Sequence, residues 1–284
     1  EVLRTFMSVG DKLMINTPVY NNFFTWINEL KLTKVEVPLK REGMHFTLDM
    51  AGIEAVYKSG VKAHLLCNPH NPVGTVYTKP ELMQIAELAD KYKVIVISDE
   101  IHAPLTFSDS TFTPFLAASD ISKKVGITVT SASKAFNLAG LKCATIVAQD
   151  PKLNAMLDTM PESVHFRASL FGAIADAVAY KSGDEWLDGV IATLDENRRL
   201  VANLLEAKVP AIKCSTAKSV GHTPPSIAPA DKVLKRIPRT FTFVTNCGNI
   251  VVTTVGSKAP ITLTQLSTLA RGGYFNNSLC HRLT

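Results

Sequence analysis

The sequence predicts an α/β fold with a mostly parallel sheet, followed by a long helix and a C-terminal segment of different composition. Two observations carry this prediction. Short apolar runs alternate with helical patterns between residues 13 and 148, and several of these runs are continuous rather than alternating in polarity. Continuous β-branched runs are typical of strands that are covered on both faces. With 284 residues, 46% of them hydrophobic, the chain has enough apolar material for one large core or two smaller ones.

The apolar runs define six predicted strands, at residues 13–16, 35–38, 62–67, 94–98, 127–131 and 143–148. The best-marked helix between them follows Thr78, which can form a capping box with Glu81, and Pro80 lies in its first turn. After residue 148 the pattern becomes helical, and we expect helices over residues 151–160, 162–181 and 185–208. The last of these has one apolar face and one charged face. A long helix that leads out of an α/β core can bridge to a second domain.

The positive net charge of the chain comes from its C-terminal segment. Residues 1–209 contain 21 Lys and Arg against 24 Asp and Glu, whereas residues 210–284, here called the tail, contain nine basic residues and a single acid, Asp231. No stripe of Lys and Arg with interleaved aromatic residues occurs, which argues against nucleic acid as a partner. The abrupt loss of acids indicates that the tail is either divergent or the product of a reading-frame change.

Membrane insertion and metal binding are also disfavoured. The apolar runs are much shorter than the ~20 residues of a membrane-spanning helix, and no signal peptide is visible. The five cysteines are far apart and form no C-x-x-C motif, which argues against a zinc site and against a disulfide framework. A reducing cytoplasm is therefore the expected location.

Polar residues cluster in three loops that follow predicted strands. The loops read CNPHNPVG at residues 67–74, SDEIH at residues 98–102 and SASK at residues 131–134. Ligands of open α/β sheets bind outside the carboxyl ends of the strands, so these loops are expected to line one crevice. Two Asn-Pro pairs and a Gly hold the first loop in a turned conformation that presents Asn71 as a rigid amide.

Each loop also has a purely structural interpretation. The Asn-Pro pairs can serve only as turns, and Asp99 and Glu100 can cap the next element. His102 can be a hydrogen-bonded core histidine, and a lysine after a strand, such as Lys134, is usually solvated. The combination and order of these residues favour a shared chemical role.

The chain resembles, over residues 1 to about 209, the pyridoxal-phosphate (PLP) enzymes of fold type I in the class I/II aminotransferase superfamily. The most similar branch is that of the MalY/PatB-type carbon–sulfur β-lyases, which the sequence matches in CNPHNPVG, SDEIHAPLTF, TSASKAFNLAG and EWLDGVIATLDENRR. The resemblance implies a three-layer α/β large domain, pyridoxal 5'-phosphate as cofactor, a small amino-acid substrate and a homodimer.

The resemblance also implies roles for residues around the cofactor ring. Lys134 matches the Schiff-base lysine, which also moves the α-proton, and Asp99 matches the carboxylate beside the ring nitrogen. Asn71 matches the amide that bonds the phenolic oxygen of the ring, and His102 occupies a position that assists it. Tyr20 matches the aromatic side chain that stacks on the ring.

Three further residues match the phosphate end of the cofactor. Ser131 and Ser133 match phosphate contacts at the start of a helix, where free backbone N–H groups favour an anion. Lys142 falls where many relatives have a basic phosphate ligand.

By resemblance, the expected activity is β-elimination from cystathionine or a cysteine conjugate, which yields a thiol, pyruvate and ammonia. Two alternatives remain open: a PLP-dependent aminotransferase, and an inactive, truncated member of the family. The second arises because the resemblance begins past a glycine-containing phosphate turn and matches no substrate-carboxylate arginine in the tail. The expected organisation is a PLP-binding large domain, incomplete at its N-terminus, over residues 1–183, a connecting helix over 184–209 and the tail in place of a small domain.

Overall fold

The computed structural model describes residues 1–43, 45–208, 240–245 and 248–253. Most of the tail lies outside the described residues. The hypothesis of a reading-frame change and the search for a substrate-carboxylate arginine concern that part of the chain. Within the tail, β9 (Thr240–Thr245) pairs antiparallel with β10 (Gly248–Thr253) in a separate two-stranded sheet. This hairpin is described by itself.

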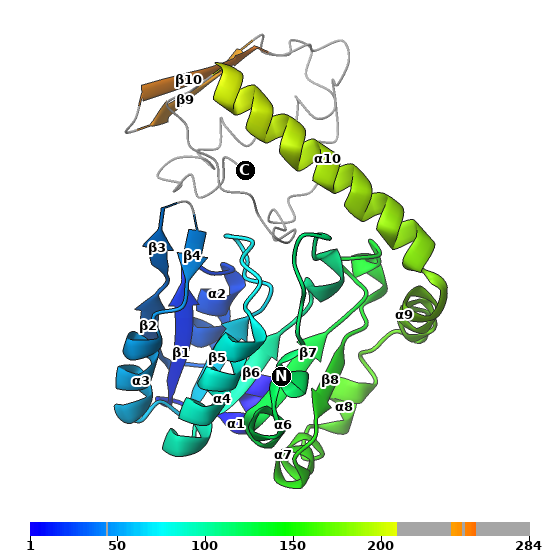
Figure 1. The fold of residues 1–284 in the computed structure, drawn as a ribbon. Helices are drawn as coiled ribbons and strands as arrows, with labels where there is room; N and C mark the ends of the chain where they lie inside the picture. Colours follow the sequence, from blue (N-terminus) through cyan, green and yellow to red (C-terminus); the bar gives the residue numbers. More distant parts are fainter. Residues whose placement is uncertain (44, 209–239, 246–247, 254–284) are drawn as a thin grey trace. The chain divides into compact units, whose positions relative to one another are not determined.

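A six-stranded sheet forms the centre of the remaining part, in the order β2-β1-β5-β6-β7-β8 (Figure 1). Its strands are β1 (Lys12–Thr17), β2 (Thr33–Pro38), β5 (Ala63–Cys67), β6 (Ile95–Asp99), β7 (Gly126–Thr130) and β8 (Thr145–Ala148). All neighbours are parallel except β7 and β8, which are antiparallel. The six strands and the mostly parallel sheet predicted from the sequence are thus confirmed.

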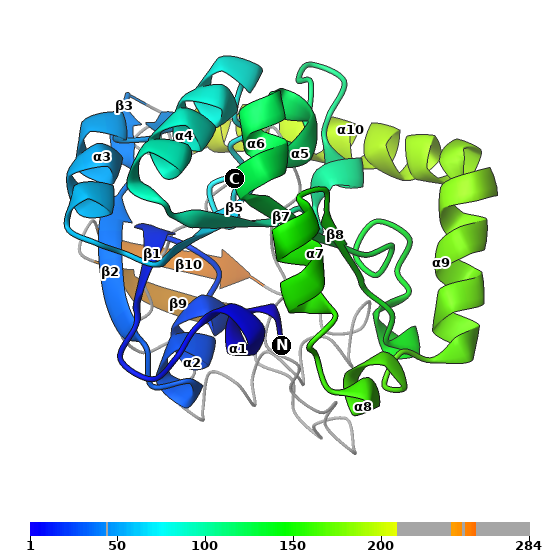
Figure 2. The same ribbon diagram turned by 90° about the horizontal axis from the view of Figure 1, so that it is seen from below.

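Helices cover both faces of the sheet, as Figure 2 shows. One face carries α3 (Met50–Lys58), α4 (Lys79–Tyr92), α5 (Phe115–Ala118) and α6 (Asp120–Val125). The other face carries α1 (Val2–Phe6), α2 (Asn22–Glu29) and α7 (Pro151–Leu157). This is the expected three-layer architecture, and the inner strands β1, β5, β6 and β7 are largely buried on both sides, whereas the edge strand β2 is mostly exposed.

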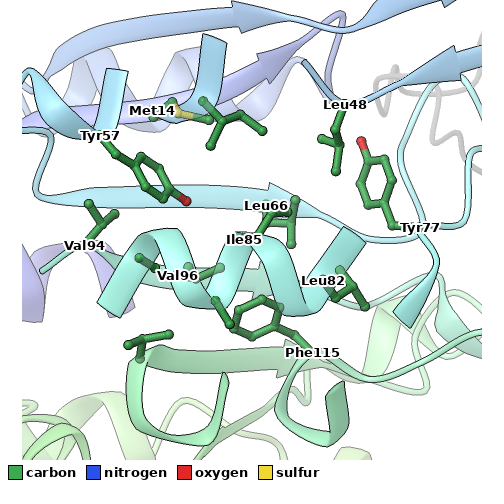
Figure 3. Packing of buried hydrophobic residues seen from close by; sticks show 14 of the residues in the cluster. Met14, Leu48, Tyr57, Leu66, Tyr77, Leu82, Ile85, Val94, Val96 and Phe115 are labelled. Carbon is green, nitrogen blue, oxygen red and sulfur yellow. The ribbon is translucent and has the colours of Figure 1, made fainter. Parts of the chain in front are cut away.

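Two apolar cores lie between these layers. The first joins Leu66 and Val96 of the sheet to Leu82, Ile85 and Phe115 of the helices, and all five side chains are buried (Figure 3). The second core lies on the other face, under α1, α2 and α7.

The predicted capping box of α4 is present. Thr78 accepts the N–H of Glu81 at 3.4 Å, and the Glu81 carboxylate accepts the N–H of Thr78 at 2.7 Å. These two bonds satisfy two N–H groups that the first turn of the helix leaves open.

The helical region after the sheet differs from the prediction in one respect. The single helix expected over residues 162–181 is divided into α8 (Glu162–His165) and α9 (Leu170–Ser182). The division falls at Ser169, whose hydroxyl caps α9 by accepting the N–H of Gly172 and whose own N–H donates to the carbonyl of Lys142 at 3.2 Å. These two hydrogen bonds replace the backbone hydrogen bonds that Ser169 would form within a continuous helix.

The long helix expected over residues 185–208 is confirmed as α10 (Asp184–Lys208). The short hairpin of β3 (Lys40–Glu42) and β4 (His45–Thr47) was not predicted. In the part of the chain that the structure describes, no helix is long and apolar enough to cross a membrane.

Two glycines allow a direct test of this packing. A Cβ at Gly126, the first residue of β7, would lie 2.5 Å from the Ser122 carbonyl oxygen and 2.7 Å from the Phe115 ring. Gly126→Ala should therefore lower the free energy of unfolding by about 1–3 kcal/mol, because the closely packed core must shift. Urea denaturation measures this change.

The control is Gly189 within α10, where an added Cβ would meet no described atom within 4 Å apart from its chain neighbours and the backbone of its own helix. Gly189→Ala should raise the free energy of unfolding by about 0.5–1 kcal/mol through helix propensity alone. Equal stability of the two variants would contradict the packing described around β7.

Candidate functional site

The three polar loops begin at the same edge of the sheet because the strands before them are in register. Cys67 of β5 pairs with Asp99 of β6, which pairs with Val129 of β7. The hydrogen-bond ladder continues past the strand ends, with Asn68 N–H donating to the Asp99 carbonyl at 3.0 Å and Glu100 N–H donating to the Val129 carbonyl at 2.9 Å. Residues just after each strand are therefore neighbours.

Asp99 and Lys134 interact across this edge. Burial raises the pKa of Asp99 to about 6, while the N–H of Ile101, 3.2 Å from Oδ1, and the charge of Lys134 act in the opposite direction. Burial lowers the pKa of Lys134, and the charge of Asp99 opposes that effect. The carboxylate and the amine therefore form an electrostatic pair that is partly removed from water.

Tyr20 lies at the same site. Burial, followed by the negative charge of Asp99, raises the pKa of its hydroxyl. That hydroxyl accepts a hydrogen bond from the side-chain amide of Asn22 at 2.8 Å, and the ring meets Phe23 and Trp26 edge-on. The structure thus brings Tyr20, Asp99 and Lys134 together from three separate segments.

The loop that contains Asn71 is held by sulfur and imidazole contacts. Asn71 is buried, and its N–H donates to Sγ of Cys67 at 3.3 Å. The thiol of Cys67 donates in turn to the Pro69 carbonyl at 3.4 Å. Next to Asn71, the His70 ring bonds the carbonyl of Pro18 at 2.8 Å, so this loop is joined to the segment that carries Tyr20.

The segment around Lys134 does not form the helix that was expected to follow the serines. It continues as turns, in which Asn137 has a left-handed φ of 56°. Ser131 Oγ donates to the Cys143 carbonyl at 2.6 Å and shares a short hydrogen bond with Ser133 Oγ. Local side-chain bonds of this kind compete with helix formation, and they fold the loop back toward β8.

The beginning of α10 packs against the lysine loop. Leu187 of α10 forms a small core with Leu105 and with Ala135, the residue after Lys134. The ring of Phe136 stacks on Trp186, with centroids 5.9 Å apart. This packing restricts the backbone on the C-terminal side of the amine.

The two remaining predicted site residues differ in burial. His102 is buried at the start of the short turn η1 (Ala103–Leu105), three residues after Asp99. Lys142 is exposed and has a left-handed backbone with φ of 55°, next to the Cys143 carbonyl that Ser131 bonds. Lys142 therefore adjoins the serine loop through its backbone but is not buried with Ser131.

Glu100 is a buried carboxylate that sequence analysis named only as a possible cap of the next element. It accepts hydrogen bonds from Ser98 Oγ at 2.9 Å, Phe115 N–H at 2.7 Å and Thr128 Oγ1 at 3.3 Å. Burial raises its pKa to about 7. The three donors indicate that Glu100 anchors the segment behind Asp99.

Asp176 of α9 was also missed, and its carboxylate accepts the N–H of Ala132 at 2.7 Å. The residue lies far along the chain from the serine loop, and no local motif marks it. Glu100, in contrast, stands in the SDEIH motif beside Asp99, although its tertiary partners Phe115 and Thr128 have no local signal.

The raised pKa of Asp99 predicts a pH-dependent gain in stability when its charge is removed. Its pKa of about 6 in the folded chain exceeds the ~3.9 of an unfolded aspartate, so ionisation destabilises the folded state. This cost is absent below about pH 4, grows between about pH 4 and 6 and is complete above that range. Asp99→Asn should raise the free energy of unfolding by about 1–3 kcal/mol at pH 8 and leave it unchanged at pH 4.

Urea denaturation at both pH values measures the difference. The control is Asp120→Asn, because Asp120 is exposed and pairs with Lys123 at 2.7 Å, which lowers its pKa. No gain at pH 8 is expected for the control. A loss of stability in Asp99→Asn at pH 8 would show that the carboxylate is not buried at a cost.

Comparisons with known proteins agree with this fold and with the motifs. The family model for aminotransferase class I and II matches residues 1–225. A Mycobacterium tuberculosis protein with a provisional cystathionine beta-lyase name is 38% identical over 221 residues, which cover 75% of this chain and 53% of that protein. The cystathionine beta-lyase of Corynebacterium glutamicum is 32% identical over 204 residues, which cover 71% of this chain and 53% of that enzyme.

Among solved structures, cystalysin from Treponema denticola, which contains a pyridoxal 5'-phosphate cofactor, superposes with a TM-score of 0.71 at 32% identity. The match covers 77% of this chain and 56% of that chain. The chain thus spans about half the length of the curated relatives it matches. The family match, the sequence identity and the shared fold together show that the chain belongs to the class I and II aminotransferase family.

Proposed function

We propose that this chain acts as a PLP-dependent carbon–sulfur β-lyase on cystathionine or a cysteine conjugate. The observation that carries the proposal is the electrostatic pairing of Asp99 and Lys134, a carboxylate and an amine at the ends of neighbouring segments of one sheet edge. The lyase names of the relatives favour elimination among the reactions of the family.

The residues at the sheet edge fit the ring of the cofactor. A protonated pyridine nitrogen needs a buried anion, and Asp99 is a carboxylate whose burial is compensated only in part by its neighbours. An aldehyde reacts with a neutral amine, and burial lowers the pKa of Lys134. The partly buried ring of Tyr20 beside Asp99 offers a flat surface for stacking.

The loop proposed to bind the cofactor phosphate contains the expected serines, but it forms turns instead of the start of a helix. Ser131 and Ser133 are adjacent, but Ser131 donates to the Cys143 carbonyl. The N–H of Ala132 is bonded to the Asp176 carboxylate. Phosphate binding at this loop therefore requires rotation of the two hydroxyls, and Lys142 would contribute charge from the exposed side.

The proposed chemistry assigns one task to each side chain. When bound, the cofactor supplies an electron sink that makes the substrate Cα–H acidic. Nζ of Lys134 removes that proton, and the Cβ–S bond breaks with the electron pair leaving on sulfur. One water is consumed as the products, a thiol, pyruvate and ammonia, are released.

One carboxylate and one amide would orient the cofactor ring during this step. Asp99 would keep the proton on the ring nitrogen, and Asn71 would bond the phenolic oxygen of the ring with the assistance of His102. Burial of Asn71 and His102 supports these assignments, because a buried amide has few orientations available.

Transamination is the second candidate, because the family model is that of the aminotransferases. It begins with the same removal of the Cα proton by Lys134. The two reactions then differ in whether a proton is returned to the cofactor side or a sulfur leaving group departs from Cβ.

We also propose the organisation implied by the family for the whole protein. Residues 1–183 form the cofactor-binding domain, residues 184–209 a connecting helix, and residues 210–284 replace the small domain. A homodimer in the cytoplasm is part of this proposal, and the free cysteines Cys67 and Cys143 in the described part of the chain are consistent with a reducing compartment.

Reduction with borohydride tests the cofactor site. Incubation of the chain with pyridoxal phosphate, followed by borohydride, should label the peptide that contains Lys134, as mass spectrometry can determine. Lys134→Ala should lose the label, whereas Lys152→Ala, which removes an exposed lysine of α7, should keep it. Absence of label on Lys134 in the wild-type chain would contradict cofactor binding and favour an inactive family member.

Product analysis separates the two candidate reactions. Cystathionine supplied without any keto acid should yield pyruvate and a thiol if the chain is a lyase. Lys134→Ala should reduce the rate by at least about 10³-fold, because it removes both the amine and the base. Turnover that requires an added keto acid would instead identify an aminotransferase.

A further inference from the structure

His70 forms two buried hydrogen bonds that none of the roles above uses. Its Nε2 lies 2.8 Å from the carbonyl oxygen of Pro18, and its Nδ1 lies 2.7 Å from the hydroxyl of Tyr77. The ring is 1% exposed and Tyr77 is 0% exposed, so water does not compete for either bond. His70 directly precedes Asn71, and Pro18 lies two residues before Tyr20.

The chemistry of the two partners fixes the proton on the ring. A carbonyl oxygen only accepts hydrogen bonds, so Nε2 must carry the proton that it donates to Pro18. Burial lowers the pKa of His70 to about 4, which leaves the ring neutral at pH 7 with an unprotonated Nδ1. The Tyr77 hydroxyl therefore donates to Nδ1, and burial, which raises its pKa, keeps it protonated.

The loop around His70 is closed by its own backbone. His70 N–H donates to the Thr75 carbonyl, and Gly74 N–H donates to the His70 carbonyl, both at 2.7 Å. Tyr77 also belongs to this short stretch. The bond from His70 to Pro18 differs because it leaves the loop and reaches the segment after β1.

We propose that His70 is a positioning residue that ties the Tyr20 segment to the Asn71 loop, with Tyr77 selecting the histidine tautomer that makes the tie. Its consequence for catalysis rests on the proposed function, in which Tyr20 and Asn71 contact the same cofactor ring. Fixing both segments before the cofactor arrives lowers the ordering cost of binding.

A second buried tyrosine–histidine pair, Tyr57 and His64, resembles the pair of Tyr77 and His70. Tyr57 OH lies 2.7 Å from His64 Nδ1, and His64 Nε2 lies 2.8 Å from Asn16 Oδ1. In both pairs the ring centroids are 5.9 Å apart. His64 lies within β5, however, and Figure 3 shows Tyr57 and Tyr77 at opposite ends of the core that they share. Tyr57→Phe thus removes an equivalent hydrogen bond away from the Asn71 loop.

The experiment compares Tyr77→Phe with Tyr57→Phe in the full chain, by hydrogen exchange without cofactor and by the affinity for pyridoxal phosphate. In Tyr77→Phe, amides of residues 17–24 and 68–77 should exchange about tenfold faster, and the Kd should rise about fivefold to tenfold. Tyr57→Phe should change both quantities less than twofold, although it loses a comparable buried bond.

The variant His70→Gln serves as a second background, which tests whether Tyr77 acts by selecting the tautomer of His70. The amide of His70→Gln can donate to the Pro18 carbonyl without help from Tyr77. Adding Tyr77→Phe to His70→Gln should therefore change exchange in residues 17–24 by less than twofold. A tenfold change in that background, or equal effects of the two tyrosine variants in the wild-type background, would overturn the proposal.

Failure of the proposed function gives a different result. A wild-type chain that binds no pyridoxal phosphate would refute the β-lyase assignment, whereas the exchange of residues 17–24 would still decide whether His70 ties the two segments.

Discussion

The register of β5, β6 and β7 is the constraint on which the site depends. Because the three strands are parallel and paired at Cys67, Asp99 and Val129, the chain leaves the sheet three times at one edge. Each exit carries a polar motif, so a carboxylate and an amine from distant parts of the sequence interact at this edge. A shift of one residue in any strand would turn its side chains to the opposite face and separate these groups.

Burial at this edge acts on both members of the central pair. It raises the pKa of Asp99 and lowers that of Lys134, and their mutual attraction only partly offsets these effects. A carboxylate and an amine in this state favour a ligand that brings a cationic nitrogen to one and an electrophilic carbon to the other. Leu187 and Trp186 of α10 pack on Ala135 and Phe136, the two residues after Lys134, and so restrict the backbone that carries the amine.

The strands and the first turn of α4 could be predicted because their signals are local. Continuous apolar runs mark the strands, and Thr78 and Glu81 mark the cap within four residues. The prediction of a helix after Lys134 was wrong. The hydroxyl of Ser131 donates to the carbonyl of Cys143, twelve residues away, and the local sequence pattern does not reveal this contact.

The site residues divide in the same way. Asn71, Asp99 and Lys134 stand in motifs that sequence alone reveals, whereas Asp176 reaches the serine loop only through tertiary packing. The imidazole of His70 was visible in its motif, but its partners Pro18 and Tyr77 became evident only in the folded chain. Tertiary hydrogen bonds of this kind have no periodic signature.

The pKa of Lys134 in the chain without cofactor, compared between wild type and Asp99→Asn, shows whether the carboxylate and the amine interact. The pH dependence of acetylation at Lys134, followed by mass spectrometry, gives this value. Since the charge of Asp99 opposes the effect of burial on the pKa of Lys134, this pKa should fall further when Asp99 is replaced by the neutral Asn. An unchanged pKa would show that the carboxylate and the amine do not face each other, and would contradict the site.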